Sequence, residues 1–244
     1  MNNRSLLFIN RELDKLYPQP KPFLKHDSVY QLLVSVILSA QCTDERVNKV
    51  TPMLFSDCPG PQKVLDLGIK GLIPYIFSCG YYNAKARNII GMTRQLLDQY
   101  EGEVPEDFDE LVKLSGVGEK TAGVVLAQAF KVPAFPVDTH IFRLAHRLGL
   151  SDKRDPNKVS TDLKALFPKN RWIDLHLQMI LHGRTLCTAR KPKCGECPLL
   201  KVCPEGKRRF ASKIEGERVR RMEKAEEGRL RMKDGKVEKP SCWA

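Results

Sequence analysis

Apolar residues recur at helical spacing along most of this chain. The recurring separations are three and four residues, which place apolar side chains on one face of a helix. They predict helices over residues 5–17, 28–41, 84–100, 139–150, 157–167 and 172–183, and a pair of helices joined by a glycine turn within residues 105–130. No segment of the sequence shows the alternation of apolar and polar residues that indicates a half-buried strand. The pattern therefore predicts an all-α fold.

Proline-rich connectors divide the predicted helices into two groups. Prolines follow the first helix and the glycine hairpin, at positions 18, 20, 22, 133 and 136. Because proline interrupts a helix, we take these connectors as domain boundaries. One helical domain is predicted over residues 22–132, and a second joins residues 1–21 to residues 133–211.

The C-terminal segment has a different composition from the rest of the chain. Its last forty residues hold 13 Lys and Arg against 8 Asp and Glu, a net charge of 13 − 8 = +5, and few large apolar residues. Such a segment has little apolar surface to bury. Residues 212–244 are therefore predicted to form a flexible basic tail, with a marginally stable charged helix as the alternative.

The charge of the whole chain points to a polyanion as partner. The 244 residues carry a formal net charge of +12, which predicts salt-sensitive binding to nucleic acid. The longest N-terminal apolar run covers residues 6–9 and is too short for a signal peptide or a membrane span. We therefore expect an intracellular protein with no membrane role, located in the cytoplasm and, in a bacterium, at the nucleoid.

The glycine turn lies in the stretch LSGVGEKTAGVVLAQAF, residues 114–130. A phosphate-binding P-loop is excluded, because Glu119 separates Gly118 from Lys120 and the preceding segment has helical rather than strand periodicity. Gly116 and Gly118 permit backbone conformations closed to other residues and let a ligand approach the main chain. The N–H groups and the positive end of the second helix suit a backbone phosphate of nucleic acid. The alternative is a simple connector between two packed helices.

Four cysteines form a cluster near the C-terminus with the spacing C-x6-C-x2-C-x5-C. The cysteines at positions 42, 58 and 79 stand singly, which is not a secreted disulfide pattern. Spacing alone leaves a structural zinc site and an iron–sulfur cluster about equally supported. Either metal would fix the loop and hold three cations on its surface, where they suit phosphate contacts: Arg190, Lys191 and Lys193.

Asp138 directly precedes an amphipathic helix, in VDTHIFRLAHRLGL. Aspartate is a favoured N-cap, so a capping role explains it locally. A carboxylate held ionised by helix N–H groups is also suited to stabilise a developing cation.

Together these motifs resemble the endonuclease III family of DNA glycosylases, in the helix-hairpin-helix superfamily. The resemblance spans residues 1 to about 210 and includes LSAQCTDERVNK and LHGRTLC. It implies two helical domains flanking a DNA-binding cleft, a monomer acting on double-stranded DNA, and excision of damaged, oxidised pyrimidines. It also implies a [4Fe-4S] cluster, which decides for iron over zinc, on Cys187, Cys194, Cys197 and Cys203.

The resemblance also assigns the residues of the reaction. The catalytic lysine of the family falls on Lys120 and its catalytic aspartate on Asp138. The lysine must attack the sugar as a neutral amine, and we expect burial and the positive helix start to favour that form. A lysine Schiff base would then support strand cleavage by β-elimination. Base excision and lyase activity would thus share one residue.

The remaining assignments concern DNA contacts. Gln41 falls where the family fills the gap left by the flipped base, and Gly116, Val117 and Gly118 form the turn that grips the backbone. Thr121 and Asp44 fall near the active site of the family. Three residues depart from it: Ser115 replaces a usual proline, Glu119 a basic residue that would attract phosphate, and Tyr81 a leucine wedge.

Three other functions compete with this interpretation. An adenine-mismatch glycosylase of the same superfamily shares the cluster and hairpin but lacks a catalytic lysine here. A non-catalytic helix-hairpin-helix DNA-binding protein and an iron–sulfur electron carrier are further alternatives. Both leave Lys120 and Asp138 without a joint role.

Overall fold

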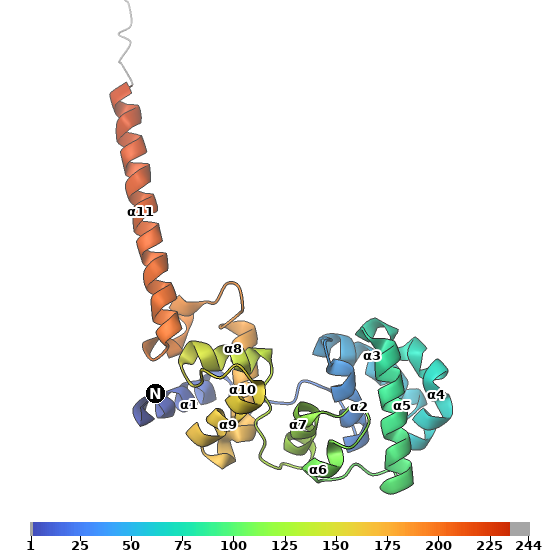
Figure 1. Ribbon diagram of the computed structural model, residues 1–244. Helices are drawn as coiled ribbons and strands as arrows, with labels where there is room; N and C mark the ends of the chain where they lie inside the picture. The colour runs from blue at the N-terminus through green and yellow to red at the C-terminus, as the bar shows by residue number, and fades with distance from the viewer. Residues whose placement is uncertain (1, 235–244) are drawn as a thin grey trace, which may run out of the picture.

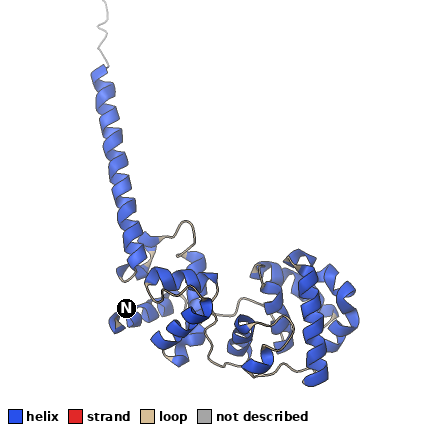
Figure 2. Cartoon of the chain, in the orientation of Figure 1, coloured by secondary structure: helices blue, strands red, loops and turns tan. Residues whose placement is uncertain are grey.

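The computed structural model describes residues 2–234, and over this range it contains helices and no strand (Figures 1 and 2). The prediction of an all-α fold is confirmed. The helices are α1 (Asn3–Leu16), α2 (Val29–Ser39), α3 (Asp44–Asp57), α4 (Pro61–Ile76), α5 (Tyr82–Gln99), α6 (Phe108–Leu111), α7 (Glu119–Ala129), α8 (Thr139–Leu148), α9 (Pro156–Leu166), α10 (Trp172–Thr185) and α11 (Pro204–Asp234). Short 3-10 turns follow α4, precede α10 and lie within the cysteine loop.

Helices α3 and α4 are absent from the sequence-based prediction. Pro52 lies inside α3, and α4 contains Pro74 and a kink at Gly68, whose φ is +64°. These residues interrupt the pattern that marks a helix, although packing overrides them in the folded chain. The first arm of the predicted hairpin is also shorter than its periodicity indicates, because α6 makes only one turn.

Polar side chains fix where most of these helices begin. Six N-cap side chains accept a hydrogen bond from a backbone N–H in the first turn of their helix: Asn2, Ser28, Thr43, Asp107, Asp138 and Asp155. Each such cap typically contributes about 1 kcal/mol. The start of α7 differs, since its N-cap is Gly118 and no side chain caps it.

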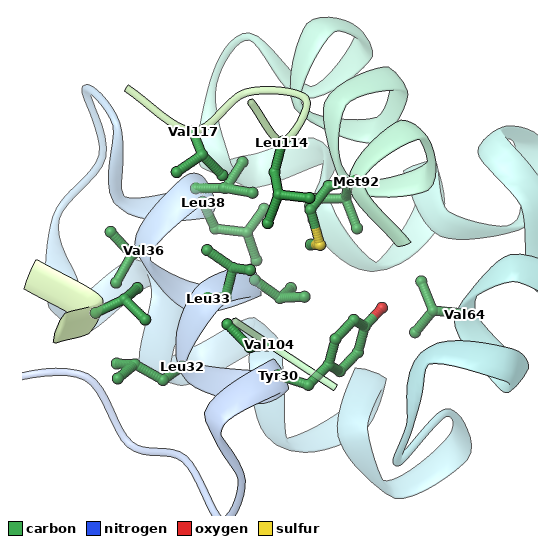
Figure 3. Close-up of a cluster of buried hydrophobic side chains, with 14 of the residues drawn as sticks. Tyr30, Leu32, Leu33, Val36, Leu38, Val64, Met92, Val104, Leu114 and Val117 are labelled. Atoms are coloured by element: carbon green, nitrogen blue, oxygen red, sulfur yellow. The ribbon is translucent and has the colours of Figure 1, made fainter. Parts of the chain in front are cut away.

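The buried apolar residues form two separate clusters. The first surrounds α2, in which every residue from 30 to 38 is buried, and includes Leu33, Leu38, Leu114 and Val117 (Figure 3). The second combines α1 with α8, α9 and α10. In Figure 1 the two groups of helices form two lobes joined by extended connectors. The two clusters support the predicted domain boundaries at residues 22 and 132, which remain predictions.

Helix α11 projects from the second lobe (Figure 1). The segment predicted as a flexible tail or a charged helix begins at residue 212, inside α11. The structure describes this segment as helix through Asp234. Residues 235–244 lie outside the described residues. None of the helices in residues 2–234 is long and apolar enough to cross a membrane.

The centre of α2 is the place where the fold tolerates least change. Leu33 is 0% exposed. Replacing it with alanine should lower the free energy of unfolding by about 2–5 kcal/mol, because the lost methyl groups leave a cavity. Leu7→Ala is the matched control, since Leu7 is 71% exposed. It should change stability by less than about 0.5 kcal/mol in the same urea titration. Equal effects of the two substitutions would contradict the described core.

Candidate active site and cysteine loop

A cavity of about 220 Å³ lies between the two groups of helices. It is lined by Phe23, Leu24, Val36, Ser39, Ala40, Gln41, Asp44, Lys120, Thr121, Val124, Gln128, Asp138, His176, Ile180 and Arg184. The structure thus brings together the two predicted catalytic residues, which come from different lobes, with predicted DNA contacts. The other predicted contacts lie outside this cavity.

Lys120 stands in the first turn of α7, directly after the uncapped start of the helix. Its neighbours Val124 and Gln128 follow at helical spacing and line the same cavity. The side chain is exposed, so the expectation that Lys120 is buried is wrong for the free protein. Exposure leaves the amine accessible to an incoming ligand, and any desolvation of it must come from that ligand.

The glycine turn before α7 uses its two glycines differently. Gly116 has φ of +77°, and a Cβ there would lie 2.6 Å from the Cβ of Asn88. Gly118 has an ordinary extended conformation with φ of −94°, so the expectation that it needs a special conformation is wrong. A Cβ at Gly118 would meet nothing within 4 Å. Since Val117 points into the core (Figure 3), the turn presents backbone rather than side chains.

Asp138 is the N-cap of α8 and half-buried. Its Oδ1 accepts a hydrogen bond from the backbone N–H of Ile141 at 2.8 Å. The capping interpretation is therefore met in the structure, and the same carboxylate also lines the cavity. The bond to the helix start leaves the second carboxylate oxygen available for other partners.

Sequence reasoning missed His176, which lines the cavity from α10. Its ring is 3% exposed, and Nδ1 lies 2.9 Å from the carbonyl oxygen of Pro136. Because a carbonyl only accepts, Nδ1 carries the proton of the neutral ring, and Nε2 then carries none. Burial lowers the pKa of His176 to about 4, against a smaller opposing effect of the charge on Asp138. The ring is therefore neutral near pH 7.

A second missed residue, Arg184, joins the lobes beside the cavity. Its Nη2 lies 2.6 Å from Oδ2 of Asp44, and its guanidinium stacks 4.4 Å from the ring centre of Phe23. Asp44 is thus engaged in an ion pair across the seam. The only sequence signal for Arg184 is its place in LHGRTLC.

Two predicted DNA contacts stand at strained backbone positions. Gln41 and Tyr81 have φ of +51° and +48°, the left-handed region that non-glycine residues rarely adopt. Both side chains are exposed. Gln41 lines the cavity, whereas Tyr81, which is 68% exposed, lies outside it at the start of α5. Such strain persists where the surrounding structure holds it, often at functional sites.

The departures at positions 115 and 119 both have partners in the structure. The Glu119 carboxylate accepts a hydrogen bond of 2.6 Å from Nδ2 of Asn157 in the other lobe. The backbone N–H of Ser115 donates to Oε1 of Gln95 at 2.7 Å, a bond that proline cannot make. Glu119 therefore contributes to the seam between the lobes.

The four clustered cysteines line one cavity of the second lobe. Hydrogen-bond donors approach their sulfurs: the N–H of Gly206 at 3.2 Å from Cys203 Sγ, and Nη1 of Arg147 at 3.3 Å from Cys187 Sγ. Burial raises the pKa of Cys197 to about 11 and also raises that of Cys203. Buried thiols of this kind need a positive partner to become thiolates, and metal supplies it.

Comparisons with known proteins agree with these two sites. The family model of the HhH-GPD superfamily base excision DNA repair proteins matches residues 34–169. That of the iron-sulfur binding domain of endonuclease III matches residues 187–203. Endonuclease III of Synechocystis sp. is 47% identical over 193 residues, 79% of this chain and 88% of the relative. Endonuclease III of Escherichia coli K12 is 44% identical over 203 residues, 83% of this chain and 96% of the relative.

The chain belongs to the endonuclease III family.

A solved structure agrees with this membership. A non-covalent endonuclease III–DNA complex has a TM-score of 0.83 and 43% identity, covering 86% of this chain and 99% of the other. A trapped endonuclease III–DNA covalent intermediate gives the same values. The two predicted helical domains with a helix-hairpin-helix motif are those of an endonuclease III fold. Membership also decides between the metals, and the cofactor is a [4Fe-4S] cluster, which the four thiols and their donors fit.

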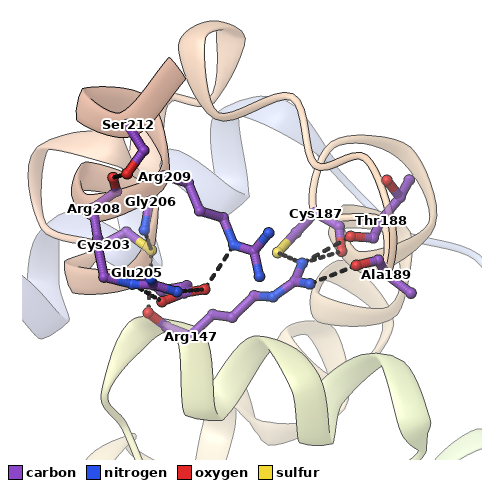
Figure 4. Close-up of polar contacts among 10 residues, drawn as sticks. All are labelled: Arg147, Cys187, Thr188, Ala189, Cys203, Glu205, Gly206, Arg208, Arg209 and Ser212. Atoms are coloured by element: carbon purple, nitrogen blue, oxygen red, sulfur yellow. Dashed lines mark hydrogen bonds and ion pairs between the residues drawn. The ribbon is translucent and has the colours of Figure 1, made fainter. Parts of the chain in front are cut away.

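In this member of the endonuclease III family, Arg147 of α8 braces the cysteine loop (Figure 4). Its guanidinium donates to the carbonyl oxygens of Thr188 and Ala189, both at 2.8 Å, as well as to Cys187. The next residues on the loop are the three predicted phosphate contacts, all of them exposed: Arg190, Lys191 and Lys193. The brace thus fixes the segment that carries these cations.

Removing this brace should loosen the cluster. Arg147→Met leaves the loop carbonyls without their donor, which typically costs about 1–3 kcal/mol. Protein purified without oxygen should then lose iron to a chelator faster than the wild type. Arg154→Met, which removes an exposed arginine of the same lobe, is the control and should lose iron at the wild-type rate. Unchanged iron loss from Arg147→Met would contradict the bracing role, and zinc without iron in the wild type would contradict the cofactor.

Proposed function

We propose that this chain is a bifunctional base excision repair enzyme, a DNA glycosylase and abasic-site lyase that removes oxidised pyrimidines from double-stranded DNA. One observation carries the proposal: Lys120 and Asp138, from different lobes, line a single cavity. A related protein of 43% identity has been trapped as a covalent intermediate with DNA. Because one chain supplies the whole cavity, we propose that it acts as a monomer.

Lys120 is the proposed nucleophile. Its neutral amine attacks C1′ of an extruded nucleotide, the bond from C1′ to the base breaks, and the base leaves with the bonding electrons and a proton. The nitrogen lone pair then forms a Schiff base between Nζ and C1′ as the bond from C1′ to the ring oxygen breaks, and that oxygen takes up a proton. The Schiff base acidifies the C2′ proton, and its removal expels the 3′ phosphate by β-elimination. Exposure of Lys120 lets the nucleotide reach it, and the bound DNA provides the desolvation.

Asp138 stabilises the positive charge that develops on the sugar as the base departs. The N–H of Ile141 keeps the carboxylate ionised and aimed from the start of α8. Asp138 therefore acts mainly before the base has left. Cleavage of a preformed abasic site depends on it less.

The remaining predicted residues position the DNA. Gln41 fills the gap left by the extruded nucleotide, and Tyr81 stacks on a base nearby. The turn of Gly116, Val117 and Gly118 binds a backbone phosphate through the N–H groups of its two glycines, because that of Val117 donates to the Leu114 carbonyl. The exposed cations of the cysteine loop contact a second stretch of backbone. The cluster, held by the four cysteines, serves to fix that loop and takes no part in excision.

The competing functions fit the cavity less well. An adenine-mismatch glycosylase has no use for a lysine at position 120 beside Asp138. A non-catalytic DNA-binding protein would need neither residue in a cavity between its lobes. Incubation with duplexes containing thymine glycol, uracil, an abasic site or an A·8-oxoguanine pair distinguishes these functions, and excision confined to the adenine mismatch would contradict the proposal.

Lys120→Gln should abolish both covalent trapping by borohydride and strand cleavage, because an amide cannot form a Schiff base. Binding to damaged DNA should be largely retained, as measured by fluorescence anisotropy. Lys131→Gln is the matched control, since Lys131 lies just beyond the far end of α7 and bonds to the Gln128 carbonyl. It should trap and cleave as the wild type does. Trapping by Lys120→Gln at the wild-type rate would mean that another amine is the nucleophile.

Asp138→Asn should slow base excision by roughly 10²–10³-fold, because it removes one electrostatic contact to the transition state. Asparagine is a good N-cap, so α8 should persist. Cleavage of a preformed abasic site should fall less, which single-turnover assays on both substrates would measure. Asp155→Asn makes the same change at the N-cap of α9 and should leave both rates unchanged. An equal loss on both substrates would contradict the assigned role of Asp138.

A further inference from the structure

The connector that delivers Asp138 to the cavity is buried and has no regular secondary structure. The residues Phe135, Pro136 and Val137, which lie between α7 and α8 in the chain, are all buried. Two side chains of the second lobe hold this connector. Ser160 Oγ donates to the carbonyl of Phe135 at 2.7 Å, and His176 Nδ1 donates to that of Pro136 at 2.9 Å. The position of Asp138 therefore depends on bonds made two and three residues before it.

His176 makes a second contact with the same segment. Its ring meets the ring of Phe135 edge to face, with centroids 6.4 Å apart and planes at 90°. The hydrogen bond and the ring contact together fix the imidazole in one orientation. In that orientation Nδ1–H points to the connector, and Nε2 is on the opposite side of the ring.

The ring also belongs to the cavity that holds the reactive pair. His176 lines it together with Lys120 and Asp138, and the charges of both act on the ring, Asp138 more strongly. A protonated imidazole here would compete with the cationic sugar for the carboxylate. A neutral ring leaves the charge of Asp138 to the sugar.

We infer that His176 is a positioning residue for base excision: its Nδ1–H holds the Pro136 carbonyl and thereby sets where Asp138 meets the sugar. This inference rests on the proposed function of Asp138. Displacement of a reacting group by about 1 Å can lower a rate by about 10²-fold, so a weakened connector matters even if the fold survives. The uncharged Nε2 gives the cavity wall an acceptor without adding a cation.

Three substitutions of His176 distinguish the contribution of Nδ1 from that of Nε2. His176→Asn keeps a donor close to the position of Nδ1, His176→Gln places an amide nearer to Nε2, and His176→Phe keeps only the ring contact. We expect His176→Asn to excise an oxidised pyrimidine close to the wild-type rate. His176→Gln and His176→Phe should excise it about 10²-fold more slowly. All three should cleave and trap a preformed abasic site nearly as the wild type does, because that substrate depends less on Asp138.

The control is His146→Phe. His146 also bonds through Nδ1 to a backbone carbonyl of the same lobe, that of Phe142 at 2.8 Å, but it does not line the cavity. It should leave the ratio of excision to abasic-site cleavage unchanged. Iron content and thermal midpoint of each variant show whether it folds.

Several outcomes would overturn the inference. Excision by His176→Phe at the wild-type rate would exclude a positioning role. Parallel loss of excision, abasic-site cleavage and thermal stability would show a purely structural role. Loss in His176→Asn with activity kept in His176→Gln would move the role to Nε2. A wild-type protein that neither excises nor traps would instead contradict the proposed function, and the inference with it.

Discussion

Lys120 and Asp138, the proposed reactive pair, meet across a seam between two hydrophobic cores, and this constraint governs the rest of the molecule. Each core fixes its own helices by apolar burial, so Lys120 is placed by the first core and Asp138 by the second. Their separation depends on the connector between α7 and α8 and on polar contacts across the seam. Those contacts, Asp44 with Arg184 and Glu119 with Asn157, are partly exposed, and each contributes only about 1 kcal/mol. Contacts of this kind allow the two lobes to move relative to one another more easily than either core deforms, which suits the proposed entry of an extruded nucleotide.

Apolar spacing predicts the helices well where no proline or kink interrupts the pattern. It fails for α3 and α4, where internal prolines and a kinked glycine hide helices that tertiary packing nevertheless stabilises. The second lobe is built from two separate parts of the chain. The sequence indicates this only indirectly, through the prolines that follow α1. The packing of α1 against α10 is a long-range fact that local periodicity does not express.

The residues of the candidate sites also divide into those that local sequence can predict and those that it cannot. That Lys120 and Asp138 share one cavity, and that the four cysteines share another, could be predicted because these residues stand in short motifs whose chemistry is local. His176 and Arg184 could not, since their partners are 40 and 140 residues distant. The exposure of Lys120 and the bond between Glu119 and Asn157 likewise depend on how two lobes meet. Motifs predict which groups react, whereas the contacts that position those groups come from the assembled fold.

Helix α8 shows how the two sites are related in space. Its N-cap is Asp138, and its last turn holds Arg147, which braces the cysteine loop. Ten helical residues rise about 15 Å, and four buried residues on one face, Ile141, Leu144, Ala145 and Leu148, fix the helix in the second core. The distance between the carboxylate and the cationic loop is therefore set by a single rigid element. In the proposed function, a duplex held by the loop meets Asp138 at a fixed offset, while Lys120 approaches from the other lobe. Adjustment to the extruded nucleotide then falls to the seam, and not to the relation between loop and carboxylate.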